Sequence, residues 1–164
     1  GRFMFAFWNV LSVPNPHSYV DCNGFSSIGL GLATAIGAAR AAGERPTLLV
    51  VGDGGFTLSG LSELATAVDE KLDLVIVVPN DGSYGAEHIA LSAHNMDPSL
   101  SLLPQRDFAR IAEAFGARGL TVTSSAELQA AMQAIATRDR KRPMVIDVKV
   151  DPASVYGGAP ISRP

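Results

Sequence analysis

Four short apolar runs, each with little alternation between polar and apolar residues, constrain the fold of this chain most strongly. They are TLLVV (47–51), LDLVIVVP (72–79), RGLTVT (118–123) and PMVIDVKV (143–150). Strands that are covered on both faces of a parallel sheet read as continuous apolar runs of this kind. The chain is therefore expected to contain a buried parallel sheet.

The segments around these runs carry apolar residues at the spacing of one helix face. Four helices are expected, with apolar faces made by Ile28, Leu32, Ala35, Ile36 and Ala39; by Leu61, Leu64, Ala65 and Val68; by Phe108, Ile111, Ala112 and Phe115; and by Leu128, Ala131, Met132 and Ile135. Capping residues stand at three of the starts, namely Ser59 or Ser62, Asp107, and Ser125. Helices that alternate with buried strands predict a single-domain α/β fold, a doubly wound parallel sheet with helices on both faces.

Composition and charge exclude several classes of protein. The 164 residues, 47% of them hydrophobic, suit one domain with a sizeable core. The net charge of −3 argues against a nucleic-acid partner. Cys22 is the only cysteine, which excludes an internal disulfide and favours a cytoplasmic location. The apolar opening stretch has neither the features of a signal peptide nor the roughly 20 residues that span a bilayer, so no membrane association is expected.

The stretch VVGDGGFTLS (50–59) places an acid among glycines directly after an apolar run. Ligands of open α/β sheets bind at the carboxyl ends of strands. Gly54 and Gly55 can adopt positive φ and expose N–H groups to a phosphate at the start of the next helix. Asp53 would repel a phosphate unless a divalent cation lay between them, and Mg²⁺ prefers such oxygen ligands. The alternative is an ordinary turn in which Asp53 caps the helix.

The next apolar run ends in a similar way, because VVPNDGSYG (77–85) places Asn80, Asp81 and Gly82 at its carboxyl end. Asn80 follows Asp53 by the length of one helix plus one strand, so both side chains are expected at the tips of adjacent strands. Taken alone, NDG is a common turn signal. Its combination with GDGG at this separation favours a shared cation site.

Together these motifs resemble the thiamin-diphosphate-binding domain of the acetolactate synthase, pyruvate decarboxylase and benzoylformate decarboxylase group. The motif of that family begins with GDG and closes with an Asn after one helix and one strand, here Gly52-Asp53-Gly54 through Asn80. The likeness extends to ELATAV (63–68), SYG (83–85), DFARIAEAFGA (107–117) and PMVIDVKVDP (143–152). It places the cofactor domain at residues 24–152, after an N-terminal extension (1–23) that continues from a missing upstream segment and before a poorly ordered tail (153–164).

The resemblance implies thiamin diphosphate and Mg²⁺ as cofactors. Asp53 and Asn80 would bind Mg²⁺ through side-chain oxygens, and Gly82 through its carbonyl. The diphosphate would lie against the segments that contain Gly52, Gly54 and Gly55, and Ser83, Tyr84 and Gly85.

Upstream, the resemblance implies that the Ser26 carbonyl accepts a hydrogen bond from the 4′-amino group of the cofactor, with Ser27 beside it. Ile28 would be the apolar wedge that bends the cofactor and brings that amino group to the reacting carbon. The alternative for Ile28 is an ordinary core position at the start of a helix.

The resemblance also implies a reaction on a 2-oxo acid, either decarboxylation or carbon–carbon bond formation. In this family a Glu from a pyrimidine-binding domain, usually of a neighbouring subunit, activates the cofactor, and no segment here resembles that domain. The acids Glu63, Asp69, Glu70 and Glu87 are expected to be solvated. The isolated chain is thus predicted to be inactive, as a fragment of a longer enzyme or one subunit of a split one, and a homo-oligomer is expected.

Two other functions stay open. In an NAD-binding oxidoreductase domain, GDGGFT would match G-x-G, but Thr57 replaces the third small residue and no acid ends the following strand. A non-catalytic interaction module of the same fold would not need Asp53 and Asn80. His88 and His94, in a connection predicted to be irregular over 87–105, are candidate substrate-facing residues, although the histidines lack metal-ligand spacing.

Overall fold

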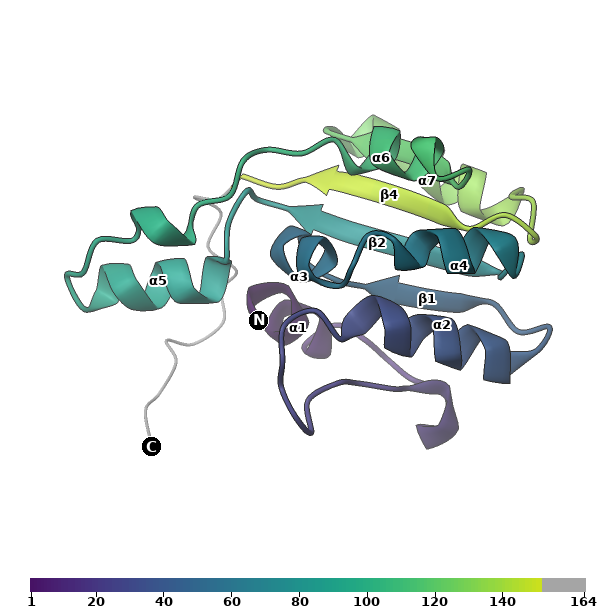
Figure 1. Cartoon of the computed structure of the whole chain (residues 1–164), viewed down its shortest axis with the longest axis horizontal. Helices are drawn as coiled ribbons and strands as arrows, with labels where there is room; N and C mark the ends of the chain where they lie inside the picture. The colour runs from purple at the N-terminus through teal and green to yellow at the C-terminus, as the bar shows by residue number, and fades with distance from the viewer. Residues whose placement is uncertain (152–164) are drawn as a thin grey trace.

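A computed structural model describes residues 1–151, so the tail predicted for 153–164 lies outside the described residues. None of the helices within 1–151 combines the length and hydropathy needed to cross a membrane. The elements follow in the order α1 (Arg2–Trp8), the 3₁₀ turn η1 (Pro16–Ser18), α2 (Gly31–Ala42), β1 (Thr47–Val50), α3 (Asp53–Leu58), α4 (Glu63–Asp69), β2 (Leu74–Asn80), α5 (Gly85–Ala93), the 3₁₀ turn η2 (Ser99–Ser101), α6 (Phe108–Ala114), β3 (Arg118–Val122), α7 (Ser125–Ala136) and β4 (Met144–Lys149) (Figure 1).

The strands form one parallel sheet in the order β1-β2-β4-β3. Apart from their end residues, these strands coincide with the four apolar runs of the sequence. The last strand along the chain lies in the middle of the sheet, between β2 and β3, where both of its edges are paired. The carboxyl ends of β1, β2 and β4 point the same way in Figure 1, toward α3 and the start of α5.

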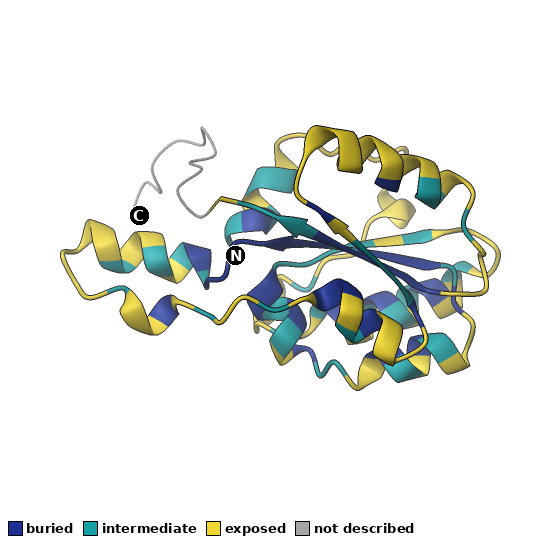
Figure 2. Cartoon of the chain, turned by 90° about the horizontal axis from the view of Figure 1, so that it is seen from above, coloured by how far each residue is buried: buried dark blue, intermediate teal, exposed yellow. Residues whose placement is uncertain are grey.

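Helices cover both faces of the sheet, which confirms the predicted doubly wound α/β fold (Figure 2). On one face, α2, α3, α4 and α6 enclose the larger core around Leu32, Phe56, Leu64, Ile76 and Phe108. On the other face, α7 packs through Ala131 over Val75, Val122, Met144 and Ile146.

The predicted start of the first large helix is wrong, because α2 begins at Gly31 and Ile28 precedes it. Ser26 has a φ of 56° and Gly29 a φ of 104°, left-handed values that a right-handed helix does not contain. The side chain of Ile28 is 48% exposed. Its alternative interpretation as a core position is therefore also wrong.

The single helix expected between the first two strands is divided into α3 and α4. Gly60, with a φ of 72°, lies in the turn that separates them. Ser62 stands at the N-cap of α4 but its side chain makes no capping bond. Ser59 ends α3 instead of opening a helix, and its hydroxyl donates to the carbonyl of Gly55 at 2.6 Å.

The predicted caps of α6 and α7 can be compared with the caps in the structure. Asp107 caps α6 as predicted, through a 3.0 Å bond from the backbone of its first turn. The cap of α7 is Ser124, one residue before the predicted Ser125. The hydroxyl oxygen of Ser124 accepts the N–H of Glu127 at 3.3 Å, and the carboxylate of Glu127 accepts the N–H and hydroxyl of Thr123, the residue before the cap.

The connection predicted to be irregular contains the helix α5 and the turn η2. The sequence of α5, GAEHIALSA, contains three Ala, one Glu and one Leu, which favour helices, whereas Pro98 and Pro104 follow it. Both elements extend away from the sheet beyond the strand ends (Figure 1). Residues 81–84 connect the end of β2 to the start of α5.

Candidate functional site

Asp53 and Asn80 lie at the tips of neighbouring strands. β1 and β2 pair in parallel with Val50 opposite Val77. Gly52 comes just after β1, Asp53 opens α3, and Asn80 is the last residue of β2. Two polar residues thus stand at the carboxyl ends of adjacent strands, where ligands of open α/β sheets bind.

Both side chains are buried, and each keeps one oxygen without a hydrogen-bond partner. Asp53 is 4% exposed and Asn80 is 1% exposed. Within residues 1–151, Asp53 Oδ1 and Asn80 Oδ1 are the buried side-chain atoms that lack a partner. An unpaired buried polar atom costs about 1–3 kcal/mol, so a ligand that contacted both of these oxygens would remove an energetic penalty. A carboxylate and a carboxamide oxygen fit Mg²⁺, a hard cation.

The second oxygen of Asp53 is occupied. Asp53 Oδ2 accepts the backbone N–H of Gly82 at 3.0 Å, which joins the first turn of α3 to the loop after β2. Burial, and to a smaller extent the nearby Asp81 carboxylate, raises the pKa of Asp53 to about 6. The fold therefore disfavours the charge of Asp53, and a bound cation would relieve that penalty.

The glycines of GDGG allow a close approach rather than a positive φ. Gly54 and Gly55 lie in the first turn of α3, so neither uses the positive φ that a glycine can adopt. α3 is six residues long, and its N-terminal residue is Asp53. A Cβ on Gly54 would lie 2.6 Å from the ring of Tyr84. The left-handed residue of the site is Gly82, with a φ of 69°.

Asp81 holds the turn that follows β2. Its Oδ1 accepts the N–H of Ser83 at 3.1 Å and the hydroxyl at 2.9 Å. Its Oδ2 accepts from the guanidinium of Arg2 in α1 at 2.7 Å, and the Asp81 side chain is fully buried while that of Arg2 is 9% exposed. A Cβ on Gly85 would meet both Arg2 and Asp81 within 3.0 Å. Arg2 is a residue that sequence reasoning missed, because a pairing across such a separation leaves no local signal.

The same turn is anchored to the segment after η2. The carbonyl of Gly82 accepts the N–H of Leu103 at 2.7 Å, and the N–H of Tyr84 donates to Ser101 at 2.8 Å. Since a carbonyl oxygen has two lone pairs, Gly82 keeps one for a further ligand. These two backbone hydrogen bonds therefore join the predicted diphosphate loop to residues 101–103.

The residues predicted for the other end of the cofactor lie elsewhere. Ser26, Ser27 and Ile28 are exposed. The adjoining Gly29 packs on the carboxyl end of α3, where its Cβ would be 3.1 Å from the carbonyl oxygen of Leu58. This loop therefore meets α3 at the end opposite Asp53.

The histidines do not join Asp53 and Asn80. His88 lies on α5 with Nδ1 2.9 Å from Ser101 Oγ, and His94 is exposed just after α5. Over residues 1–151 there is no group of three or more His, Cys, Asp or Glu side chains placed to hold a metal, so a cation at Asp53 depends on amide and carbonyl oxygens as well. The acids predicted to be solvated are exposed, namely Glu63, Asp69, Glu70 and Glu87.

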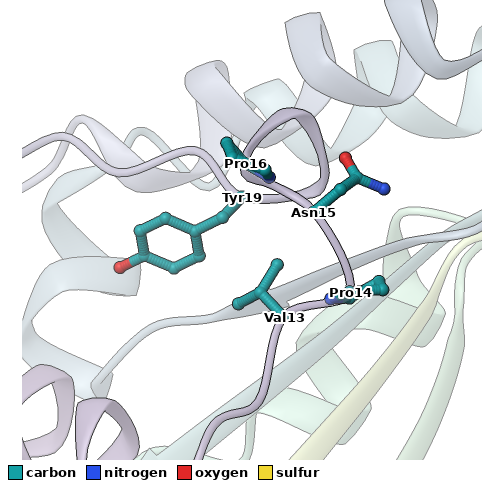
Figure 3. A pocket seen from close by; sticks show the side chains of 5 residues that line it. All are labelled: Val13, Pro14, Asn15, Pro16 and Tyr19. Carbon is teal, nitrogen blue, oxygen red and sulfur yellow. The ribbon is translucent and has the colours of Figure 1, made fainter.

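A separate hollow in the N-terminal loop does not suit a diphosphate. It contains no charged side chain and none of the predicted site residues (Figure 3). Tyr19, on its wall, accepts a hydrogen bond from the indole of Trp8 at 2.5 Å. The residues that line the hollow are Val13, Pro14, Asn15, Pro16 and Tyr19.

Comparison with known proteins indicates the same family that the sequence motifs resemble. Residues 1–148 match the family described as thiamine pyrophosphate enzyme, C-terminal TPP binding domain. The chain is 33% identical to a 2-hydroxyacyl-CoA lyase of Arabidopsis thaliana over 94% of this chain and 27% of the lyase. It is 31% identical to the mitochondrial acetolactate synthase catalytic subunit of Saccharomyces cerevisiae, over 84% of this chain and 20% of that subunit.

A similar result comes from solved structures. The thiamine diphosphate-dependent 4-hydroxybenzoylformate decarboxylase of Rhodococcus jostii RHA1 superposes with a TM-score of 0.68 and 29% identity, covering 76% of this chain and 23% of the decarboxylase. The chain thus spans roughly a quarter or less of the length of the proteins it is similar to, between 20% and 27%.

Proposed function

The chain belongs to the thiamine pyrophosphate enzymes, as a C-terminal TPP-binding domain, and from this premise we propose that it binds the diphosphate end of the cofactor through Mg²⁺ held by Asp53 and Asn80. The observation that carries the proposal is the pair of buried, unpartnered oxygens, Asp53 Oδ1 and Asn80 Oδ1. Together with the free lone pair of the Gly82 carbonyl, they make an oxygen-only ligand set of the kind that Mg²⁺ prefers.

The chain's own residues bind and orient the cofactor. The diphosphate lies against the first turn of α3 and the loop after β2, at Gly52, Gly54, Gly55, Ser83, Tyr84 and Gly85. The loop before α2 serves the pyrimidine end, with the Ser26 carbonyl as acceptor, Ser27 beside it and Ile28 as the apolar wedge. When bound, thiamin diphosphate supplies an electron sink for making or breaking a bond at the carbonyl carbon of a 2-oxo acid.

The exposed loop before α2 supports the proposal of a partner domain. Phe25 is 85% exposed, Ile28 is 48% exposed and Leu30 is 41% exposed, so this loop offers apolar surface that its own domain leaves uncovered. We propose that a pyrimidine-binding domain, from the same or a second chain in an oligomer, covers this surface and completes the site. The isolated chain is then inactive.

The whole enzyme is proposed to resemble acetolactate synthase in its class of reaction, a decarboxylation or carboligation of a 2-oxo acid. The cofactor domain is proposed at residues 24–152. The preceding residues 1–23 reach back to the site through the ion pair of Arg2 with Asp81.

The test is calorimetric titration of the chain with thiamin diphosphate, with and without Mg²⁺, and with NAD. Metal-dependent heat with thiamin diphosphate, lost in Asn80→Ala, is the expected result. Heat with NAD would instead support a dinucleotide-binding oxidoreductase. If neither ligand gives heat, even after a pyrimidine-binding domain is added, the interaction module becomes the better description.

A further inference from the structure

The carboxamide of Asn80 is held by two acceptors that fix which way it points. Asn80 Nδ2 donates to Asp147 Oδ1 at 2.9 Å and to the carbonyl of Arg106 at 3.1 Å. Neither a carboxylate nor a backbone carbonyl can donate. Turning the carboxamide by half a rotation would place Oδ1 against two oxygens. The bonded orientation therefore leaves Oδ1, the atom without a partner, on the opposite side.

Asp147 is itself firmly placed. It is fully buried in β4, and β4 pairs with β2 in a register that sets Val78 opposite Asp147. Its Oδ2 accepts the N–H of Phe108 at 3.0 Å and the ammonium of Lys149 at 2.8 Å. Both oxygens are thus satisfied, and the neighbouring cation compensates the buried charge.

Lys149 also supports the second acceptor of the carboxamide. Its ammonium donates to the carbonyl of Arg106 at 2.7 Å, in addition to its ion pair with Asp147. The two acceptors that hold Asn80 are therefore connected to each other through one side chain. These side chains form a small closed hydrogen-bond network, and the Asn80 oxygen that it leaves without a partner is Oδ1.

We propose that Asp147 is a positioning residue for the metal site, which orients Asn80 so that oxygen rather than the amide N–H₂ faces the cation. The proposal rests on the proposed function of Asp53 and Asn80. An amide turned the other way would present two partial positive hydrogens to Mg²⁺ and could not coordinate it. Partners beyond the ligands commonly fix ligand orientation in this way, and their loss typically lowers metal affinity about 10–100-fold.

The orientation itself can be tested without cofactor or metal. In the metal-free chain, the two Nδ2 hydrogens of Asn80 should give side-chain amide NMR signals that exchange slowly with solvent, because both are bonded in a buried site. In Asp147→Asn the exchange should become much faster. Signals of Asn80 that exchange at the solvent rate in the unaltered chain would overturn the proposal, and this measurement does not require any variant to fold.

The consequence for the metal is tested by titrating Mg²⁺ at saturating thiamin diphosphate. We expect Asp147→Asn to weaken Mg²⁺ binding at least about tenfold. The matched control is Ile146→Ala, which alters the same strand but on the opposite face, under α7. This control should lower Tm and leave Mg²⁺ affinity within about twofold, since it touches no ligand partner.

The possible outcomes distinguish a failure of the proposed function from a failure of the role proposed for Asp147. An unaltered chain that binds no Mg²⁺ with the cofactor contradicts the proposed function, while the exchange measurement still reports on Asp147. A folded Asp147→Asn protein with unchanged Mg²⁺ affinity refutes the role of Asp147 alone. Equal weakening in Asp147→Asn and Ile146→Ala also refutes it, because loss of stability would then explain the effect.

Discussion

The backbone N–H of Gly82 donates to Asp53 Oδ2 across 3.0 Å, and this one bond joins the tips of β1 and β2. It uses one oxygen of the carboxylate and leaves the other without a partner. Asp53 therefore fixes the relative position of the two loops while it still has an oxygen to offer. This explains why a buried acid stands in a glycine-rich turn at a cost to the free protein.

The energetic penalty of burying the charge of Asp53 predicts the effect of Asp53→Asn on the stability of the metal-free protein. Burial raises the pKa of Asp53 from 3.8 to about 6. A raised pKa in the folded state means that the charged form destabilises the fold above about pH 6 and that this penalty vanishes below the unfolded value. Asp53→Asn should accordingly raise Tm at pH 7–8 relative to the unaltered chain, and the difference should shrink as the pH is lowered toward 4. Thermal unfolding across this pH range measures it.

Asp97→Asn is the matched control, since the bonds from Ser99 lower the pKa of Asp97. Its charge favours the fold, so this substitution should lower Tm at neutral pH, the opposite sign. An Asp53→Asn protein that is less stable than the unaltered chain at pH 8 would show that the charge of Asp53 has a partner in the free protein.

The raised pKa of Asp53 also predicts the pH dependence of metal binding. Mg²⁺ needs the deprotonated carboxylate, so its affinity should be nearly constant above about pH 6 and fall about tenfold per pH unit below it. Binding near pH 6 should release a proton, which calorimetry in buffers of different ionisation enthalpy detects. An affinity that does not change between pH 5 and 7.5 would contradict a role for Asp53 as ligand.

The fold and the two strand tips could be predicted because their signals are local. A strand buried on both faces reads as a continuous apolar run, and the residue that ends it is visible in the sequence, as with Asn80. The orientation of that side chain depends on Asp147, which only the central position of β4 brings near. Arg2 reaches Asp81 through a similarly distant pairing. The sequence predicted an irregular connection where α5 lies, because the histidine in this segment and the prolines after it were given more weight than the residues that favour a helix.

The close approach of Tyr84 to Gly54 predicts that this glycine cannot be replaced without loss. Its backbone is helical, so Ala would suit the conformation, but the added Cβ would lie 2.6 Å from the ring. The ring must move, and we expect Gly54→Ala to lower the free energy of unfolding by about 1–3 kcal/mol. Gly37→Ala in α2 is the control, because nothing lies within 4 Å of its Cβ. It should raise the free energy of unfolding by about 0.5–1 kcal/mol in urea titrations. A stabilised Gly54→Ala protein would mean that the ring is free to shift.

The buried ion pair of Arg2 with Asp81 predicts that α1 contributes strongly to the stability of the site loop. Arg2→Met removes the guanidinium and leaves Asp81, whose side chain is fully buried, without its cation at 2.7 Å. Breaking such a pair costs about 3–5 kcal/mol, because one charge stays buried and uncompensated. Arg40→Met is the matched change at the exposed pair with Glu70, where about 0–1 kcal/mol is expected. Urea unfolding of both variants measures these changes in the free energy of unfolding. Equal decreases in the two variants would mean that Asp81 finds another partner when Arg2 is replaced.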